Sequence, residues 1–334
     1  PYNDIIRKFI DMYAGRLRNQ VSFMLSACNF YMPIFEEALD AYGLPLELRY
    51  LPIIESALNP SAVSRAGASG LWQFMIGTGK IYGLESNSLV DERRDPIKAT
   101  WAAARYLKEM YDIYGDWNLV IAAYNCGPGT INKAIRRANG ETDYWKIYNY
   151  LPKETRGYVP AFIAANYVMT YYCDHNICPM ETNIPASTDT VQVNKNLHFE
   201  QIADLCNVPL DQIKSLNPQY KKQMIPGDSK PYTLRLPIDA ISTFIDKQDT
   251  IYTHRADELF RNRKTVAVKD ITPTTRKTTS AVAGKGNLTY YTIKSGDTLS
   301  TIARKYGVTI KDIQRWNGMS STKIAAGKRL KIYK

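Results

Sequence analysis

Histidine and cysteine are scarce in this sequence of 334 residues. The three histidines, His175, His198 and His254, lie far apart, so a histidine-based metal site or nucleophile is not expected. The five cysteines match no zinc-ligand spacing, and their odd number leaves at least one unpaired. Cys173 and Cys178 are expected either to close a small loop in an oxidising compartment or to remain two buried thiols. A bond between them would indicate export.

Long hydrophobic runs are also absent. No segment approaches the roughly 18 apolar residues that span a bilayer. The sequence opens at Pro1 with neither an initiator methionine nor a signal peptide, so a cytosolic protein or a removed targeting segment is expected. Hydrophobic residues make up 45% and charged residues 22%, which is typical of folded rather than disordered chains. The length allows two or three domains of roughly 100–200 residues.

Acidic residues are few in the C-terminal quarter. Residues 261–288 carry seven Lys or Arg against one acid, and residues 289–334 carry ten against two. The net charge of the whole chain is +11, whereas residues 1–260 alone carry −3. This quarter is therefore expected to face an anionic polymer or surface, such as cell-wall polymer, lipid headgroups or nucleic acid.

Strand-like alternation is nearly absent from residues 1–180, which carry helix start and stop signals instead. Asp95 and Pro96 supply an N-cap and a first-turn proline, and Gly115 supplies a stop. Similar signals predict helices over 99–114, 116–125, 130–138 and 153–172. Residues 127–129 are expected to separate the second of these helices from the third. The first half is predicted to be helical.

The second half contains an internal repeat, in which residues 191–217 align on 291–317 without a gap. Identical pairs are Ile202 and Ile302, Ala203 and Ala303, Val208 and Val308, Ile213 and Ile313, and Asn217 and Asn317. Each copy predicts strand, helix, turn, helix and strand, the last strand being 232–236 or 329–333. The intervening stretch has few large apolar residues and is expected to be a solvated linker.

One carboxylate lies in an apolar pattern in the first half. Leu48, Leu51, Glu55 and Leu58 are spaced to share one stripe of a helix over 46–58. Burial there would keep Glu55 protonated near neutral pH, as a general acid requires. The alternative is a carboxylate solvated at the rim of the stripe.

Four motifs surround this candidate in sequence order. Glu55-Ser56 precedes Gly-Leu-Trp-Gln-Phe-Met at 70–75, Ala-Tyr-Asn-Cys-Gly at 123–127 and Glu-Thr-Arg-Gly-Tyr-Val at 154–159. Over residues 30–172 the chain thus resembles the lysozyme-like lytic transglycosylases of peptidoglycan, of the membrane-bound murein transglycosylase D type. The resemblance implies a single catalytic acid, Glu55, which protonates the leaving oxygen and then accepts the proton of the substrate's C6 hydroxyl.

The resemblance also implies substrate contacts at Ser56, Gln73, Met75, Tyr124, Asn125 and Tyr158. Gln73 and Asn125 would lie near the acetamido group, and Tyr158 would assist through a hydrogen bond. Ser56 would orient Glu55 and Met75 would line the subsite, while Tyr124 and Trp72 are expected either to stack on sugars or to pack in the core. Packing and turn roles are the alternatives for Asn125 and Tyr158.

The repeat resembles LysM glycan-binding modules, which recognise chains containing N-acetylglucosamine. Its C-terminal copy reads Tyr-Thr-Ile-Lys-Ser-Gly-Asp-Thr-Leu at 291–299 and places Gly296, Asp297 and Thr298 at the expected sugar groove. Asp297 and Thr298 are alternatively helix-capping residues. The first copy has Asn-Leu-His at 196–198 instead, so either sugar binding or a structural role is expected of it.

These observations predict an α+β multidomain protein. The expected parts are a mainly helical lysozyme-like domain at 1–180, a degenerate LysM-like module with an appendage at 187–258, a basic linker at 259–288 and a LysM module at 289–334. The chain is expected to be an exported bacterial lytic transglycosylase, periplasmic or outer-membrane-associated, that forms 1,6-anhydroMurNAc ends. Peptidoglycan glycan strands are the expected partner, without cofactor, metal or nucleic acid, and membrane association would require a lost N-terminal anchor. The sequence sets no oligomeric state.

Two alternative functions remain open at this stage. The first is a noncatalytic peptidoglycan-binding scaffold, which the presence of Glu55 disfavours. The second is a lysozyme-type hydrolase, which needs a second carboxylate such as Asp91, Asp95 or Glu154 facing Glu55. A nucleic-acid binder is disfavoured because the basic C-terminal quarter shows no nucleic-acid motif of interleaved aromatic and basic residues.

Overall fold

The computed structural model describes two folded units, residues 1–273 and 274–334. Within them, the described residues are 2–182, 184–185, 187–261, 288–294, 297–317, 319, 324 and 327–333. Most of the predicted linker, residues 262–287, therefore lies outside the described residues. The chain is mainly helical with small two-stranded sheets, which confirms the predicted α+β class.

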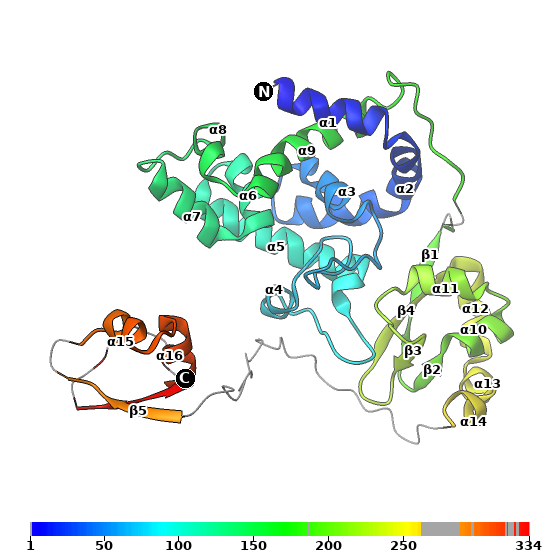
Figure 1. The fold of residues 1–334 in the computed structure, drawn as a ribbon. Coiled ribbons are helices and arrows are strands. Elements are labelled where there is room, and N and C mark those ends of the chain that lie inside the picture. The colour runs from blue at the N-terminus through cyan, green and yellow to red at the C-terminus, as the bar shows by residue number, and fades with distance from the viewer. Residues whose placement is uncertain are drawn as a thin grey trace. The chain divides into compact units, whose positions relative to one another are not determined.

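The first unit begins with a helical domain, drawn from blue to green in Figure 1. Its elements are α1 (Asp4–Ala14), α2 (Arg18–Ala41), η1 (Leu46–Tyr50), α3 (Leu51–Ser56), α4 (Ile76–Ile81), η2 (Glu92–Arg94), α5 (Pro96–Tyr114), α6 (Trp117–Cys126), α7 (Pro128–Arg137), α8 (Tyr144–Ile147), η3 (Tyr148–Tyr150) and α9 (Lys153–Thr170). Helix α9 packs against α1, α3 and α6, while α5 packs against α2 and α6. The core between these helices includes Phe35, Leu51 and Trp72, none of them exposed.

The capping signals in the sequence set the helix ends correctly in two cases and wrongly in one. Asp95 caps α5, which ends at Gly115 in a left-handed conformation (φ 62°), and Asp116 caps α6. Helix α7 begins at Pro128 rather than at residue 130. Gly127 (φ 81°) alone forms the turn between α6 and α7. Pro128 fits the first helical position because its missing N–H needs no partner there.

The predicted helix over 46–58 is wrong as a continuous element. The 3₁₀ turn η1 is followed by the single α-helical stretch α3, and Ala57 and Leu58 then take left-handed conformations with φ of 52° and 58°. Ala57 N–H bonds Ile53 O and Leu58 N–H bonds Pro52 O, so the helix ends in a left-handed turn of the αL type. Leu58 is buried by this turn and not by helical spacing.

A small α/β module follows in the same unit, in yellow-green in Figure 1. It comprises β1 (Thr188–Val193), β2 (Asn196–His198), α10 (Phe199–Cys206), α11 (Leu210–Leu216), β3 (Met224–Pro226), β4 (Tyr232–Pro237), α12 (Ile238–Asp246), α13 (Gln248–Thr253) and α14 (Ala256–Leu259). Strand β1 pairs antiparallel with β4, and β2 pairs with β3. Phe244 of α12 and Ile251 of α13 join the module's core, so the predicted appendage does pack on the module.

The second unit repeats this plan with β5 (Leu288–Thr292), α15 (Leu299–Tyr306), α16 (Ile310–Asn317) and β6 (Arg329–Tyr333). Strands β5 and β6 are antiparallel, and Ile302, Ile313 and Ile332 are buried between sheet and helices. The unit therefore has a core of its own.

The repeated asparagine serves the same purpose in both copies. Asn217 donates to Ile213 O (2.9 Å) and Arg235 O (2.8 Å) and accepts from Arg235 N–H (2.8 Å). Asn317 makes the equivalent three bonds, with Lys331 in place of Arg235. One side chain thus ties the second helix to the last strand.

The cysteine pair and the search for membrane spans give two further results. Cys173 and Cys178 are both free and exposed, so they match neither the disulfide nor the pair of buried thiols. In the part of the chain that the structure describes, no helix combines the length and the apolar character needed to cross a bilayer.

We expect Asn217→Ala to lower the free energy of unfolding by about 2–4 kcal/mol, because the buried backbone groups of the last strand lose their partners. Urea unfolding measures this change. Asn19→Ala is the control, since Asn19 is exposed on α2 and its loss should change stability by no more than about 0.5 kcal/mol. A loss below that control value for Asn217 would contradict the account of the repeat.

Candidate active site

A cavity of about 440 Å³ opens beside the end of α3 in the helical domain. Residues on its walls come from the N-terminal helices, from α3 and the left-handed turn that follows it, and from the loop before α4. They are Tyr13, Leu17, Gln20, Met24, Ile53, Ile54, Glu55, Ser56, Ala57, Ala62, Val63, Ser64 and Gln73. This size suits part of a sugar chain, since ligand pockets typically measure about 300–1,000 Å³.

Glu55 is the carboxylic acid in this wall. It is half-buried in the last turn of α3, and the buried Tyr158 of α9 donates its hydroxyl proton to Glu55 Oε1. Helix α9 reaches this position because it packs closely on α1. A Cβ at Gly157 would lie 3.3 Å from the Phe9 ring, so a larger residue would require this ring to shift.

Burial raises the pKa of Glu55 from 4.5 to about 7. The hydrogen bond from Tyr158 lowers this pKa, because it favours the carboxylate, and the negative charge of Glu154 raises it. Burial is the largest of the three effects. Glu55 can therefore hold a proton at neutral pH and also release it.

Gln73 and Ser56, two of the expected substrate contacts, also line the cavity. Gln73 has a left-handed backbone (φ 50°), and its amide donates to Gly70 O at 2.8 Å, which leaves its side-chain oxygen able to accept a bond. The Ser56 hydroxyl lies 2.9 Å from Leu71 O and 3.0 Å from Pro52 O. It thus ties α3 to the loop before α4 and makes no bond with the carboxyl group of Glu55.

Three further predicted contacts are not part of the cavity wall. Met75 is exposed at the start of α4, and the Tyr124 hydroxyl donates to Trp72 O at 2.7 Å. Asn125 is half-buried near the end of α6, where its side-chain oxygen accepts a bond from Thr155 Oγ1 at 2.9 Å, so its amide protons remain available. Trp72 is fully buried, so the stacking role considered for it is wrong.

The wall formed by α1 and the start of α2 was not foreseen from the sequence. Tyr13 is buried next to Tyr158 and its pKa is raised to about 12 by burial, whereas Gln20 is exposed at the cavity. Leu17 and Met24 supply apolar surface. The apolar spacing of these helices predicts a buried face, but no local pattern says that the face meets Glu55.

The candidate second carboxylates have other partners. Asp91 is buried in an ion pair with Arg93 (2.8 Å), and Asp95 accepts the N-terminal amides of α5. Glu154 is exposed on the first turn of α9 and acts on Glu55 only through its charge. Over the described residues, no cluster of three or more His, Cys, Asp or Glu is placed to hold a metal ion.

The residues predicted to bind glycan in the C-terminal module have local partners. Asp297 accepts a bond from the Tyr291 hydroxyl at 2.8 Å. Thr298 and Thr301 bond each other's backbone amides at 3.0 and 3.2 Å at the start of α15, so the expected capping role is present. Gly296 lies outside the described residues. Sugar binding by these residues stays a prediction.

Comparisons with known proteins follow the same divisions of the chain. The transglycosylase SLT domain family matches residues 32–147, the LysM-like domain of lytic transglycosylase MltD matches 187–253, and the LysM domain matches 291–332. Membrane-bound lytic murein transglycosylase D of Escherichia coli K12 is 31% identical over 336 residues, covering 99% of this chain and 69% of the relative. The soluble lytic murein transglycosylase of the same organism is 33% identical over 35% of this chain and 19% of its own length.

A solved structure, that of the 70 kDa soluble lytic transglycosylase of E. coli, is 29% identical and covers 43% of this chain and 24% of its own, with a TM-score of 0.38. The sequence matches decide the class: a transglycosylase SLT domain is joined to two modules of the LysM kind. The chain belongs to the family of membrane-bound lytic murein transglycosylase D.

We expect Glu154→Gln to lower the pKa of Glu55 below about 7, because a repelling charge is removed, and Tyr158→Phe to raise it, because a bond to the carboxylate is lost. NMR titration of ¹³C-labelled glutamate side chains measures both shifts. Glu141→Gln is the control, since Glu141 is exposed and paired with Lys146 at 3.0 Å. A Glu55 that titrates near 4.5 in the parent would contradict the proposed environment.

Proposed function

We propose that this chain is a peptidoglycan lytic transglycosylase that cleaves the β-1,4 bond between MurNAc and GlcNAc and leaves 1,6-anhydroMurNAc ends. The observation that carries the proposal is Glu55, whose pKa is raised to about 7 in a cavity of sugar size. Family membership supports the reaction class.

The reaction needs one group that gives and then takes a proton. Protonated Glu55 donates to the glycosidic oxygen as the C1–O bond breaks. The resulting carboxylate then removes the proton of the substrate's C6 hydroxyl, whose oxygen attacks C1 and closes the anhydro ring. Glu55 is protonated again at the end, and no water is consumed. A pKa near the working pH suits both steps, because the group must act as acid and as base.

The remaining polar groups suit the sugar's acetamido substituent. Gln73 offers an acceptor and Asn125 offers donors, as the two sides of an acetamide require. Thr155 holds the orientation of Asn125. Tyr158 keeps a hydrogen bond on Glu55 and stabilises its carboxylate once the proton has left. Positioned donors and acceptors of this kind stabilise developing charge without reorganisation.

The two alternative functions fit the residues around Glu55 less well. A lysozyme-type hydrolase needs a second carboxylate across the bond, at a distance of roughly 5–9.5 Å from the first. Asp91 and Asp95 are bound elsewhere, and Glu154 remains the one candidate of the three that acts on Glu55. A noncatalytic scaffold would have no use for a buried acid with a raised pKa.

Location and partners follow from the same proposal. We expect the protein to act in the periplasm or at the outer membrane, where peptidoglycan lies, and the name of the E. coli relative includes "membrane-bound". Peptidoglycan strands are its partner, and the basic C-terminal unit is expected to hold it on the wall. Nucleic acid is not expected as a partner.

We expect Glu55→Gln to fold like the parent but to release no soluble muropeptides from purified sacculi, because an amide keeps the shape and cannot give a proton. Chromatography with mass detection measures the release. General acid catalysis contributes roughly 10²–10⁴-fold. Turnover by the variant at a tenth of the parent rate would therefore remove Glu55 from its role.

We expect the released sugar ends to contain no oxygen from solvent, because the attacking oxygen is the substrate's own. Digestion in H₂¹⁸O followed by mass analysis of the muropeptides is the measurement. Digestion of the same sacculi with a lysozyme, which is a hydrolase, is the positive control for incorporation of ¹⁸O. Label at the new ends would identify a hydrolase, in which case Glu154→Gln should abolish it.

We expect deletion of residues 261–334 to leave turnover of short soluble glycans intact and to weaken retention on insoluble sacculi. The C-terminal unit has its own core, so its removal should not disturb residues 1–260. A tether raises the local substrate concentration and should therefore affect binding rather than chemistry. Sacculus pull-downs over a range of salt measure retention. Equal retention of the full-length and truncated proteins at all salt concentrations would contradict the tether. A difference in retention at low salt alone would assign wall binding to charge rather than to Asp297 and Thr298.

A further inference from the structure

The loop that carries Gln73 is strained and needs support. Gln73 has φ of 50°, a conformation that residues other than glycine adopt at a cost of about 1–3 kcal/mol. The loop is pinned by backbone bonds between Ser69 N–H and Phe74 O (3.0 Å) and between Gly70 N–H and Ala62 O (3.0 Å). Gln73 N–H also bonds Gly70 O (3.2 Å), and the Ser56 hydroxyl bonds Leu71 O (2.9 Å), so this wall of the active site is held both from within and by its neighbours.

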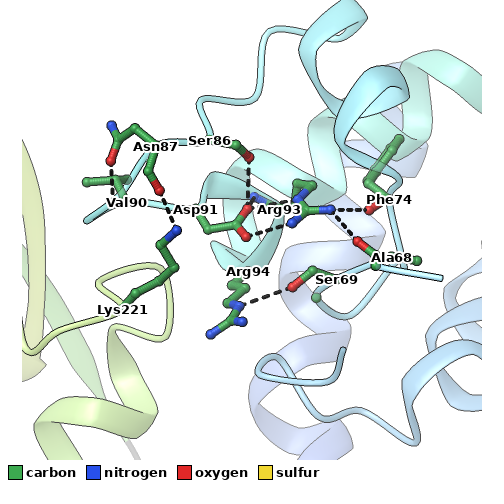
Figure 2. A network of polar contacts seen from close by, with 12 residues as sticks. Ala68, Ser69, Phe74, Ser86, Asn87, Val90, Asp91, Arg93, Arg94 and Lys221 are labelled. Atoms are coloured by element: carbon green, nitrogen blue, oxygen red, sulfur yellow. Dashed lines mark hydrogen bonds and ion pairs between the residues drawn. The ribbon is translucent and has the colours of Figure 1, made fainter. Parts of the chain in front are cut away.

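Arg93 holds this loop at two points (Figure 2). Its Nη1 donates to Gly67 O at 2.8 Å and to Phe74 O at 2.9 Å, directly after Gln73. Its backbone also lies against the loop, because a Cβ at Gly70 would fall 1.7 Å from Arg93 O. A glycine is therefore required at residue 70, where φ is +88°.

Arg93 is in turn fixed by Asp91. Arg93 Nε and Nη2 bond the two carboxylate oxygens at 2.9 and 2.8 Å, and the two side chains are only 6% and 3% exposed. Ser86 adds a third bond to Asp91 at 3.0 Å. Burial alone would raise the pKa of Asp91, but the Arg93 guanidinium brings it below its usual value. The pair is charged and rigid.

The segment that carries Asp91 is built into the small α/β module (Figure 2). Asp91 N–H bonds Gln219 O at 2.9 Å, Lys221 N–H bonds Leu89 O at 2.8 Å, and the Lys221 ammonium group bonds Asn87 O. Leu89 and the fully buried Val90 belong to the core of the module rather than to that of the helical domain.

A second connection lies a few residues earlier. Glu85 pairs with Lys230 at 2.6 Å and accepts a bond from the Tyr232 hydroxyl at 3.0 Å. Glu92 Oε2 then accepts from Glu85 N–H at 2.8 Å and so joins this connection to η2. One face of residues 85–94 is thus held by the module, and the other holds the loop of Gln73.

We propose that the module at 187–258 is a positioning element of the active site, acting through Asp91 and Arg93 on Gln73. Asp91 and Arg93 are positioning residues, since they touch the loop and not the substrate. The inference rests on the proposed function for its catalytic readout. If the inference is correct, changes in the module lower turnover of soluble substrate. A module that only binds sugar would instead affect retention on the insoluble wall.

The first test is a double-mutant cycle on soluble glycan strands released from sacculi by an amidase. Arg93→Lys keeps the charge but cannot reach Asp91 and both loop carbonyls at once. We expect kcat/KM to fall at least about tenfold in the parent background, because small misplacements of binding groups are costly. In a Gln73→Ala background the same change should cost less than about twofold, since Arg93 acts through Gln73. Equal losses in both backgrounds would overturn the proposal.

The second test addresses the module. Lys221→Met removes the bond to Asn87 O. It should lower kcat/KM in the parent but not in the Gln73→Ala background. Lys221→Arg keeps a donor for Asn87 O and should have a kcat/KM near that of the parent. The control is Arg49→Lys, which alters a pair between Arg49 and Glu36 away from this loop and should leave turnover near the parent value. Loss of sacculus retention without loss of soluble turnover in Lys221→Met would instead identify a sugar-binding module.

Amide hydrogen exchange separates this inference from the proposed function. Arg93→Lys and Lys221→Met should each speed exchange across residues 63–75 by about tenfold or more, whether or not any glycan is cleaved. Thermal unfolding checks that both variants remain folded. If the parent forms no anhydro ends but exchange responds, the proposed function fails and the coupling stands. Unchanged exchange in both variants would overturn the coupling.

Discussion

The carboxyl group of Glu55 is held out of water at the end of one helical turn, and the chemistry proposed for this chain depends on that position. Burial raises its pKa to about 7 against the opposing hydrogen bond of Tyr158. This burial lowers the stability of the folded protein when Glu55 is ionised, because the folded state disfavours the carboxylate. The stabilising contribution of protonated Glu55 is complete below pH 4.5 and is lost as the pH rises towards 7.

The position of Glu55 requires supports that are distant in the sequence. Helix α9 supplies Tyr158 and packs on α1, where Gly157 leaves room for the Phe9 ring. The left-handed turn after α3 buries Leu58 and ends the helix directly after Glu55 and Ser56. On the opposite side, Arg93 and Asp91 stabilise the loop of Gln73. Glu55, its hydrogen-bond donor Tyr158 and the loop of Gln73 are thus fixed by three separate pieces of packing.

The sequence predicted which residues around Glu55 are buried better than the backbone geometry that buries them. The apolar spacing around Glu55 correctly indicated burial, although the continuous helix inferred from it was wrong. Leu48, Leu51 and Leu58 are buried, but through a 3₁₀ turn, a short helix and a left-handed turn. Periodicity detects which residues face the core and cannot detect a change of helix type within ten residues.

The contribution of α1 to the cavity and the bond between module and loop could not be predicted from local patterns. Tyr13 meets Tyr158 across about 145 residues of chain, and Lys221 meets Asn87 across 134. By contrast, the equivalence of Asn217 and Asn317 was visible as a sequence repeat, because each asparagine makes its contacts within its own module. Motifs therefore select Glu55 as the candidate acid, whereas only the three-dimensional structure indicates what holds its surroundings in place.

The most direct test of the central claim is the pH dependence of kcat/KM on soluble glycan strands. If protonated Glu55 is the acid, the rate should be high below the Glu55 pKa of about 7 and should fall tenfold per pH unit above it. Glu154→Gln should move the midpoint to lower pH. A rate that stays constant or rises from pH 6 to pH 9 would contradict the account.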